Sequence, residues 1–501
     1  MGPYLLAIDQ GTTTCRAVLY DLEGYAIAEA YREVYPHHPQ PGWAEADPQD
    51  WWWAVVAVVH EVLSHSGAAP SDIAGIGVAA LQHAIVPVDR EGQPLARAML
   101  WMDQRCAPQV EWMIHQHGET IRRVMGEGRF PTTTYSAPKL RWWAENRPEV
   151  IRRAAVFLLP KDYLRYRLTG EAATDPSDAG GAFLYHPSRH GWATELLELI
   201  GVPAEKMPPI RQPYEIVGRV SGAAAAQTGL AEGTPVATGC ADTLSTLIGA
   251  NALLPERGYL YLGTAAWLAL YDYSYPYVTT YQRPPATIEG RYPFGSVATT
   301  GAALRWFHDL LRPTPAGPGV HPQIDYGSLL AQAEEVEPGA EGLIFLPHLM
   351  GERATNDPRA KGAFFGLTLA HGRMHLLRAL LEGTAFVLRQ LLDHSGYGPP
   401  RELLALGGGA KSPLWCQIMA DVMDIPVLMP RVVETTSLGA AILAGVGVGL
   451  YPSVAQAAER VLHIVGRHDP RTEFRARYDR IYALYRQLDE LLTPYFPRVP
   501  V

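Results

Sequence analysis

The 501-residue chain contains only four cysteines, Cys15, Cys106, Cys240 and Cys416, and no two of them form a CxxC pair. Cysteines scattered in this way indicate neither a disulfide framework nor a zinc site. No uninterrupted apolar run reaches the roughly 18 residues of a membrane helix, and the N-terminus does not have the pattern of a signal peptide. We therefore expect a reduced, cytoplasmic protein without a membrane partner.

Positive charge is also in short supply. The chain has 42 Lys and Arg against 51 Asp and Glu, which gives a formal net charge of −9. This balance argues against nucleic acid as a general partner. With 48% hydrophobic and 19% charged residues the composition is that of a globular protein, and the length exceeds one ordinary core and suits two domains.

A short polar turn lies between two apolar runs near the N-terminus, Tyr4–Ile8 and Ala17–Tyr20, and this pattern predicts a β-hairpin. Gly11 lets the backbone pass close to a bound group, and the amides of Thr12–Thr14 can form a nest for anions. Asp9, at the end of the first strand, is well placed to hold Mg²⁺ through water. The alternative is an ordinary hairpin with a polar tip.

The plan of this hairpin recurs at the start of the second half of the chain. Gly11-Thr12 corresponds to Gly263-Thr264, and Tyr20-Asp21 corresponds to Tyr271-Asp272. An internal duplication explains the recurrence most simply. The second copy has no carboxylate where the first has Asp9, so the two halves would share the phosphates of a ligand but not a metal.

Helix and strand signals alternate through the first half, which predicts an α/β domain. Asp47-Pro48 is a helix start, with an Asp N-cap and Pro at the first helical position, and the helix is expected to stop at Gly67. The apolar run Ile76–Ala80 predicts a buried strand with a polar end at Gln82-His83. We expect helix through Tyr135–Arg167 and a site-lining loop at 174–181.

Asp242 is the candidate for a catalytic base. Direct phosphoryl transfer needs a held nucleotide, an acceptor hydroxyl and a base that takes its proton. Asp242 follows the predicted strand Pro235–Thr238 and lies close to an expected domain boundary at Gly249, between domains 1–249 and 250–501. It could equally be a helix N-cap, because Thr243 opens a helix-like run.

Glycines mark the corresponding places in the second half. The strand Leu403–Leu406 opens into Gly407–Ser412, which lacks the Gly-Lys-Ser/Thr core of a P-loop but suits close approach by a flat ligand. Gly301 is expected to start a helix, and Thr435 to start a small-residue helix that packs tightly. Residues 313–322 are expected to form a surface loop.

Taken in order, these motifs resemble the carbohydrate kinases named for their FGGY motif, within the superfamily of sugar kinases, actin and Hsp70. Within that family the similarity is greatest to the xylulokinases, and it covers nearly the whole chain. The stretches that carry it are Asp9–Arg16, Ala137–Leu140, Leu158–Leu164, Leu168–Ala179, Phe345–Leu367, Gly407–Asp421 and Glu434–Ala441.

The resemblance implies two duplicated ribonuclease H-like α/β domains with a central cleft that closes on ATP and a sugar. It implies Asp242 as general base and Asp9 as the carboxylate associated with Mg²⁺. The nucleotide-binding residues that it implies are Gly11, Thr12, Thr13, Arg16, Gly263, Thr264, Gly301, Gly408, Gly409 and Ser412. The substrate-binding residues that it implies are Gln82, His83, Trp101, Asp178, Asp242 and Thr243. The phosphate would go to a terminal hydroxyl, O5 in xylulose, and a homodimer is also suggested.

Two departures from the xylulokinase pattern leave the sugar open. The usual Gln-Met-His-Gly is Leu81–Ala84 here, with the sequence Leu-Gln-His-Ala, and the usual Asp-Asn is Asp242-Thr243. Kinases of ribulose, glycerol or erythritol are the alternatives within the family. The rival from another class is an actin- or Hsp70-like nucleotide switch, which would need neither Asp242 nor a polar sugar pocket.

Overall fold

The computed structural model describes residues 2–126, 129–254, 256–270, 279–283, 287–290, 294–297, 299–311, 325–351, 359–394 and 398–499. The chain folds into two compact units. Unit 1 consists of Met1–Asn251, Tyr273–Arg291 and Thr435–Leu462, and unit 2 of Ala252–Asp272, Tyr292–Glu434 and His463–Val501. A late segment of the chain thus packs with the first unit, and the division into domains 1–249 and 250–501 stays a prediction.

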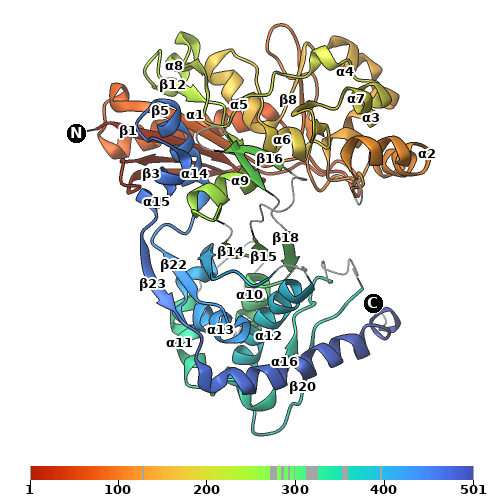
Figure 1. Cartoon of the computed structure of the whole chain (residues 1–501), viewed down its shortest axis with the longest axis vertical. Coiled ribbons are helices and arrows are strands. Elements are labelled where there is room, and N and C mark those ends of the chain that lie inside the picture. Colours follow the sequence, from red (N-terminus) through yellow and green to blue (C-terminus); the bar gives the residue numbers. More distant parts are fainter. Residues whose placement is uncertain are drawn as a thin grey trace. The chain divides into compact units, whose positions relative to one another are not determined.

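Unit 1 is built on a seven-stranded mixed sheet (Figure 1). Three strands form an antiparallel meander, and the sheet continues from the first strand of that meander, β1, through β5 to the remaining strands. The strands are β1 (Tyr4–Gln10), β2 (Thr14–Tyr20), β3 (Ala26–Glu33), β5 (Ile73–Ala80), β11 (Ile216–Arg219), β12 (Pro235–Ala237) and β13 (Cys240–Ala241). β5 is parallel to β1 and also to β12 and β13, and β11 is antiparallel to β12.

Unit 2 is built on a six-stranded sheet with the same pairing pattern. Its strands are β14 (Arg257–Leu262), β15 (Ala266–Ala269), β18 (Phe294–Val297), β21 (Glu402–Leu406), β22 (Val427–Pro430) and β23 (Ile464–His468). β18, β15 and β14 form an antiparallel meander, β21 and β22 follow in parallel, and β23 closes the edge antiparallel. The predicted duplication is confirmed by this shared order, although Tyr271-Asp272 lies outside the described residues.

Helices and short strand pairs complete each unit. The helices of unit 1 are α1 (Pro48–Ser66), α2 (Ala107–Met125), α3 (Ser136–Asn146), α4 (Pro148–Arg153), α5 (Pro160–Thr169), α6 (Pro176–Gly181), α7 (Thr194–Ile200), α8 (Gly222–Thr228), α9 (Asp242–Gly249), α14 (Thr435–Gly447) and α15 (Val454–Val461). Those of unit 2 are α10 (Gly301–Leu310), α11 (Tyr326–Glu334), α12 (Arg373–His394), α13 (Pro413–Met423) and α16 (Thr472–Leu492). The short pairs are β4 (Glu45–Ala46) with β7 (Ala98–Met99), β6 (Val86–Val88) with β8 (Val156–Leu158), β9 (Tyr185–His186) with β10 (Gly191–Trp192), β16 (Thr279–Arg283) with β17 (Thr287–Gly290), and β19 (Ile344–Leu346) with β20 (Ala363–Phe365).

The sequence signals for α1 are confirmed. Asp47 Oδ1 accepts a hydrogen bond from the Gln49 amide at 2.9 Å, Pro48 is the first helical residue, and Gly67 ends the helix with a φ of 63°. This φ lies in the left-handed region that glycine adopts at low cost.

Two expectations for unit 1 are wrong. The stretch 135–167 is not one helical segment, because Pro148 and Pro160 each begin a new helix and β8 lies between α4 and α5. Proline lacks the amide hydrogen that a continuing helix needs, but it fits the first position of a new helix. The expected loop at 174–181 contains α6, whose start is capped by the Asp175 carboxylate. The expected loop at 313–322 lies outside the described residues.

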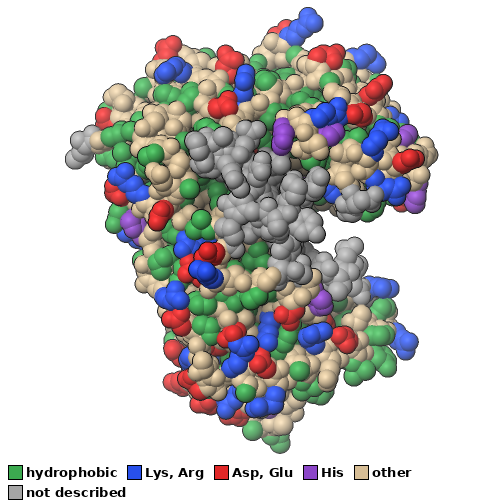
Figure 2. Space-filling view, viewed as in Figure 1, with side chains coloured by type: hydrophobic (Ala, Val, Ile, Leu, Met, Phe, Trp, Pro, Cys, Tyr) green, Lys and Arg blue, Asp and Glu red, His purple; other side chains and the backbone are tan. Residues whose placement is uncertain are grey.

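Alternating side chains of β1 place α1 and α14 on opposite faces of the first sheet. Leu6 and Ile8 belong to the core cluster that contains Trp51 of α1. Leu5 points to the other face, where its Cδ1 atom would lie 2.9 Å from a Cβ atom added to Gly445 of α14. Among the described helices none is long and apolar enough to cross a bilayer. Acidic and basic side chains are interspersed over the face shown in Figure 2.

Glycines bring α14 into close contact with its neighbours in unit 1, as the small-residue pattern predicted. A Cβ atom on Gly439 would lie 1.9 Å from the carbonyl oxygen of Ser245 in α9. A Cβ atom on Gly249 would lie 2.0 Å from the carbonyl oxygen of Thr435. A Cβ atom on Gly77 of β5 would lie 1.9 Å from the carbonyl oxygen of Ala440. The backbones of α9 and β5 therefore approach the backbone of α14 so closely that only glycine fits at the three contact points.

We predict that Gly439→Ala lowers the free energy of unfolding by about 1–3 kcal/mol or more, because the added methyl group must push α9 and α14 apart. Urea denaturation of the variant measures the loss. Gly118→Ala in α2 is the matched control, since a Cβ at Gly118 meets nothing within 4 Å. Equal stabilities for the two variants would contradict the packing argument.

Candidate active site

Three parallel strands of unit 1 bring the predicted residues to one edge of the sheet. In the register, Asp9 of β1 lies beside Ala79 of β5, and Ala79 lies beside Cys240 of β13. Two strand spacings separate Asp9 from Cys240, or roughly 10 Å. Gln82-His83 follows β5 and Asp242 follows β13 at this same edge. The structure thus brings together the carboxylates and the polar pair that the sequence singled out.

Asp242 is the first residue of α9, and it does not cap the helix. The N-cap position is occupied by Ala241, whereas Asp242 Oδ1 accepts hydrogen bonds from the amide of Thr243 at 2.6 Å and from its hydroxyl at 3.2 Å. A capping carboxylate would instead accept from an amide two or three residues further on. Burial raises the pKa of Asp242 to about 6, while the bonds from Thr243 act to lower it.

His83 has a fixed orientation and a defined tautomer. Its backbone has a φ of 70°, and its Nδ1 lies 2.6 Å from the carbonyl oxygen of Gly181. Because a carbonyl only accepts, Nδ1 carries the proton and Nε2 is left as an acceptor. Burial lowers the pKa of His83 to about 4, so the ring is neutral at pH 7. The neighbouring amide of Gln82 donates to the carbonyl of Ser177 at 3.3 Å.

Sequence reasoning missed the residues that hold His83 in place. The carbonyl oxygen of His83 accepts from the Ser136 hydroxyl at 2.9 Å and from Lys139 Nζ at 3.0 Å, both in α3. Lys139 is fully buried, and its ammonium group also donates to the carbonyl of Thr134 at 2.7 Å. Burial lowers the pKa of Lys139 to about 7. The available signal was a lysine between Ala137 and Leu140, both apolar.

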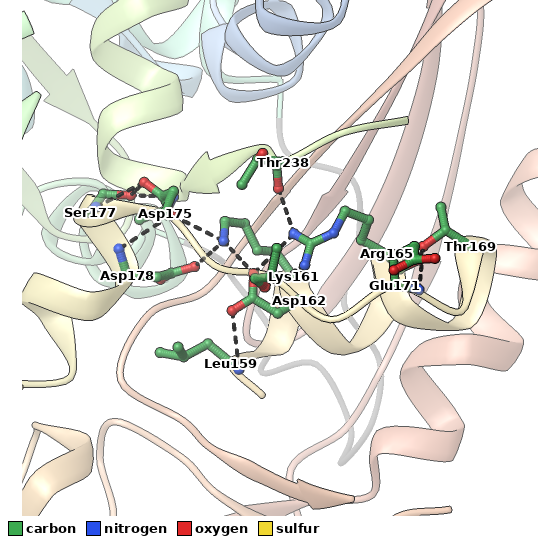
Figure 3. A network of polar contacts seen from close by, with 12 residues as sticks. Leu159, Lys161, Asp162, Arg165, Thr169, Glu171, Asp175, Ser177, Asp178 and Thr238 are labelled. Carbon is green, nitrogen blue, oxygen red and sulfur yellow. Dashed lines mark hydrogen bonds and ion pairs between the residues drawn. The ribbon is translucent and has the colours of Figure 1, made fainter. Parts of the chain in front are cut away.

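Buried charged side chains of α5 and of the start of α6 form an ionic network (Figure 3). Nζ of Lys161 is 2.5 Å from Asp162, 3.0 Å from Asp175 and 3.0 Å from Asp178. Burial acts to lower the pKa of Lys161, but the three carboxylates outweigh it and raise the pKa above its usual value. Arg165 adds a second cation through its 3.1 Å contact with Asp162. The network therefore ties α5 to the start of α6.

Asp178 belongs to this network and is 1% exposed. Burial, together with the nearby carboxylates Asp175 and Asp162, raises its pKa well above the usual value. Its proposed contact with substrate stays a prediction.

The first glycine-threonine turn is tightly closed. The amide of Gly11 donates to the carbonyl of Thr14 at 2.8 Å, and Trp101 Nε1 donates to the Thr12 hydroxyl at 3.0 Å. Arg16 of β2 lies opposite Asp9 in the hairpin register. Among the described residues no group of three or more His, Cys, Asp or Glu side chains gathers around a possible metal position. A single carboxylate such as that of Asp9 is compatible with Mg²⁺, which commonly binds one or two carboxylates and otherwise keeps water and phosphate ligands. The role of Asp9 as the metal residue stays a prediction.

Unit 2 contains a cavity of about 960 Å³. The predicted nucleotide-binding residues of the second half all line it, namely Gly263, Thr264, Gly301, Gly408, Gly409 and Ser412. The amide of Gly301, at the start of α10, donates to the carbonyl of Gly263 at 2.9 Å, so the second turn and a helix N-terminus meet there. Trp306 and Tyr326 add aromatic surface to the lining.

The sequence and the structure both match known kinases. Residues 4–249 match the N-terminal domain, and residues 277–448 the C-terminal domain, of the FGGY family of carbohydrate kinases. The chain is 30% identical to the xylulose kinase of Bacillus subtilis (strain 168), over 97% of this chain and 96% of that one.

The chain belongs to the FGGY family of carbohydrate kinases. It is also 34% identical to the glycerol kinase of Citrifermentans bemidjiense, over 94% of this chain and 95% of the relative. The crystal structure of a xylulose kinase from Rhodospirillum rubrum superposes with a TM-score of 0.83 at 31% identity, covering 98% of this chain and 99% of that one. The family, the fold class and the enzyme class expected from the sequence are confirmed.

We predict that Lys161→Met lowers the free energy of unfolding of this FGGY kinase by about 3–5 kcal/mol, because it removes one partner of a buried ionic network. Chemical denaturation at pH 7 measures the change. Arg189→Met is the control, since Arg189 pairs with Glu195 at the surface and exposed pairs contribute at most about 1 kcal/mol. A Lys161→Met variant as stable as the control would show that the network does not stabilise unit 1.

Proposed function

We propose that this FGGY kinase transfers the γ-phosphoryl group of ATP to the terminal hydroxyl of a small open-chain sugar, and that the sugar is D-xylulose, converted to D-xylulose 5-phosphate. The observation that carries the proposal is the meeting of Asp9, His83 and Asp242 at one edge of the unit 1 sheet. The relatives named as xylulose kinases support the choice of sugar.

The cavity of unit 2 is the proposed site for ATP. Its volume suits a nucleotide-sized ligand, and its glycine-rich lining lets backbone amides approach phosphate groups. The N-terminus of α10 adds a partial positive charge beside the Gly263-Thr264 turn. The rings of Trp306 and Tyr326 offer flat apolar surface to a base.

The edge of unit 1 is the proposed site for the sugar and for the proton transfer. Nε2 of His83 accepts a hydrogen bond from a sugar hydroxyl, because the proton of the ring is on Nδ1, which donates a hydrogen bond to the carbonyl oxygen of Gly181. Asp242 takes the proton of the attacking hydroxyl, and its pKa near 6 places it close to the pH at which a base works best. Mg²⁺ held through Asp9 would neutralise charge on the phosphates. The turn at Thr12 and Thr13 is the proposed phosphate contact in this unit.

A glycerol-like polyol is the second candidate substrate. It is favoured by the 34% identity to a glycerol kinase and by the two positions where the chain departs from the xylulokinase pattern. Gln82 replaces a methionine and Thr243 replaces an asparagine, so the hydrogen-bonding groups around the sugar differ. A cytoplasmic location and a homodimer remain predictions from the sequence.

A coupled assay of ADP release tests the function over pentuloses, hexuloses and polyols. We expect the highest kcat/KM with D-xylulose; a higher value with glycerol would establish the second candidate. With the best substrate, Asp242→Asn should lower kcat by about 10²–10⁴-fold and leave ATP affinity unchanged. Asp89→Asn, in a surface turn, is the control. The proposal would be refuted if no pentulose, hexulose or polyol caused ADP release. Normal turnover by Asp242→Asn would refute it as well.

We predict an acid limb in the pH profile of kcat/KM with a pKa of about 6. The base acts when deprotonated, so kcat/KM should be constant above this pKa and fall tenfold per pH unit below it. Thr243→Val removes a hydrogen bond that stabilises the carboxylate and should move the limb to higher pH. If the acid limb of Thr243→Val stayed at the pH of the parent enzyme, the limb would not report the titration of Asp242.

A further inference from the structure

Ser177 makes hydrogen bonds to three different parts of unit 1. It is fully buried in the first turn of α6. Its hydroxyl donates to the carboxylate of Asp175 and accepts from the backbone amide of Ala241 at 2.9 Å. Its carbonyl accepts from the side chain of Gln82. One residue therefore contacts the strand end before the proposed base and the proposed sugar-binding loop.

The contact with Ala241 gives the buried backbone amide of this residue a hydrogen-bond acceptor from outside the sheet. β13 has only two residues, Cys240 and Ala241, and pairs with β5 on one side. A buried amide without an acceptor costs free energy, so loss of the Ser177 hydroxyl would disfavour the present position of the Ala241 backbone. Asp242 follows directly, and its direction is set by the backbone that this hydrogen bond fixes.

The hydroxyl is itself held by the ionic network (Figure 3). Asp175 Oδ2 accepts hydrogen bonds from the backbone amide of Ser177 at 2.8 Å and from the Ser177 hydroxyl. The other carboxylate oxygen of Asp175 lies 3.0 Å from Lys161 Nζ. Because Lys161 and Asp175 are fully buried, the carboxylate has no water to turn toward. The hydroxyl proton of Ser177 therefore points to Asp175, and its lone pair points to Ala241.

We infer that Ser177 is a positioning residue, which orients Asp242 for proton abstraction through the backbone of Ala241. The inference rests on the proposed role of Asp242 as the base. Ser177 touches neither nucleotide nor sugar in this scheme; its contribution is made through the geometry of the base alone.

The variant Ser177→Ala tests this, because it removes the hydroxyl and keeps the carbonyl that Gln82 contacts. We expect kcat to fall by about 10–100-fold, as for a misplaced catalytic group, with KM for ATP within about twofold of the parent. Ser177→Thr, which retains a hydroxyl, should restore most of the loss. If Ser177→Ala does not fold, Ser177→Cys serves in its place, because it has the same shape with a slightly larger atom and only a weak hydrogen-bonding group.

A double-mutant cycle with Asp242→Asn separates positioning from mere stability. If Ser177 acts through Asp242, then Ser177→Ala should cause no further fall in kcat, within about twofold, once the base is gone. Thr228→Val is the control: it removes another fully buried hydroxyl, which donates to the Ala224 carbonyl at 2.7 Å, and should leave kcat unchanged.

Two results would overturn the inference: an unchanged kcat in Ser177→Ala, or an equal fall in kcat whether or not Asp242 is present. Both leave the proposed function intact as long as Asp242→Asn alone is slow. Normal turnover by Asp242→Asn would instead refute the proposed function itself.

Discussion

The pairing of β5 with a parallel strand on each side is the constraint on which the rest of the site depends. β1 and β13 both align with the last two residues of β5, Ala79 and Ala80. Parallel strands that end together place whatever follows them at one edge of a sheet. Asp9, the Gln82-His83 pair and Asp242 therefore meet without long loops, and each reaches the site from the end of a rigid element.

Buried polar groups fix the parts of the site that the strands leave free. Lys139 holds the backbone of His83, whose left-handed conformation turns its ring toward Gly181. Lys161 and Asp175 hold the start of α6, and Ser177 links that start to β13. Removing one partner of a buried ion pair is strongly destabilising, but the intact pair is seldom more stable than apolar residues of similar volume would be. The placement of groups beside the site therefore explains this network better than a net gain in stability does.

The sequence predicted the elements whose signals are local. Asp47, Pro48 and Gly67 set the ends of α1 by capping, and the two glycine-threonine turns indicated the duplication that the two sheets share. The six nucleotide-binding residues proposed for the second half line one cavity. Prediction failed where tertiary contacts decide. The contacts of Lys161 with Asp175 and Asp178, and of the Ser177 hydroxyl with Ala241, join different elements of the chain, and no periodic pattern records those pairings. The helix α6 was missed although its start has a local signal, the Asp175 N-cap followed by Pro176.

The central claim is that the carboxylate of Asp242 receives the proton of the hydroxyl that is phosphorylated. A crystal structure with D-xylulose, or the best substrate found, and a non-hydrolysable ATP analogue tests it most directly. We predict an Asp242 oxygen within about 3 Å of the terminal hydroxyl of the sugar, in line with the terminal phosphate of the analogue. A sugar bound with that hydroxyl out of reach of Asp242 and beside a different base would contradict the account.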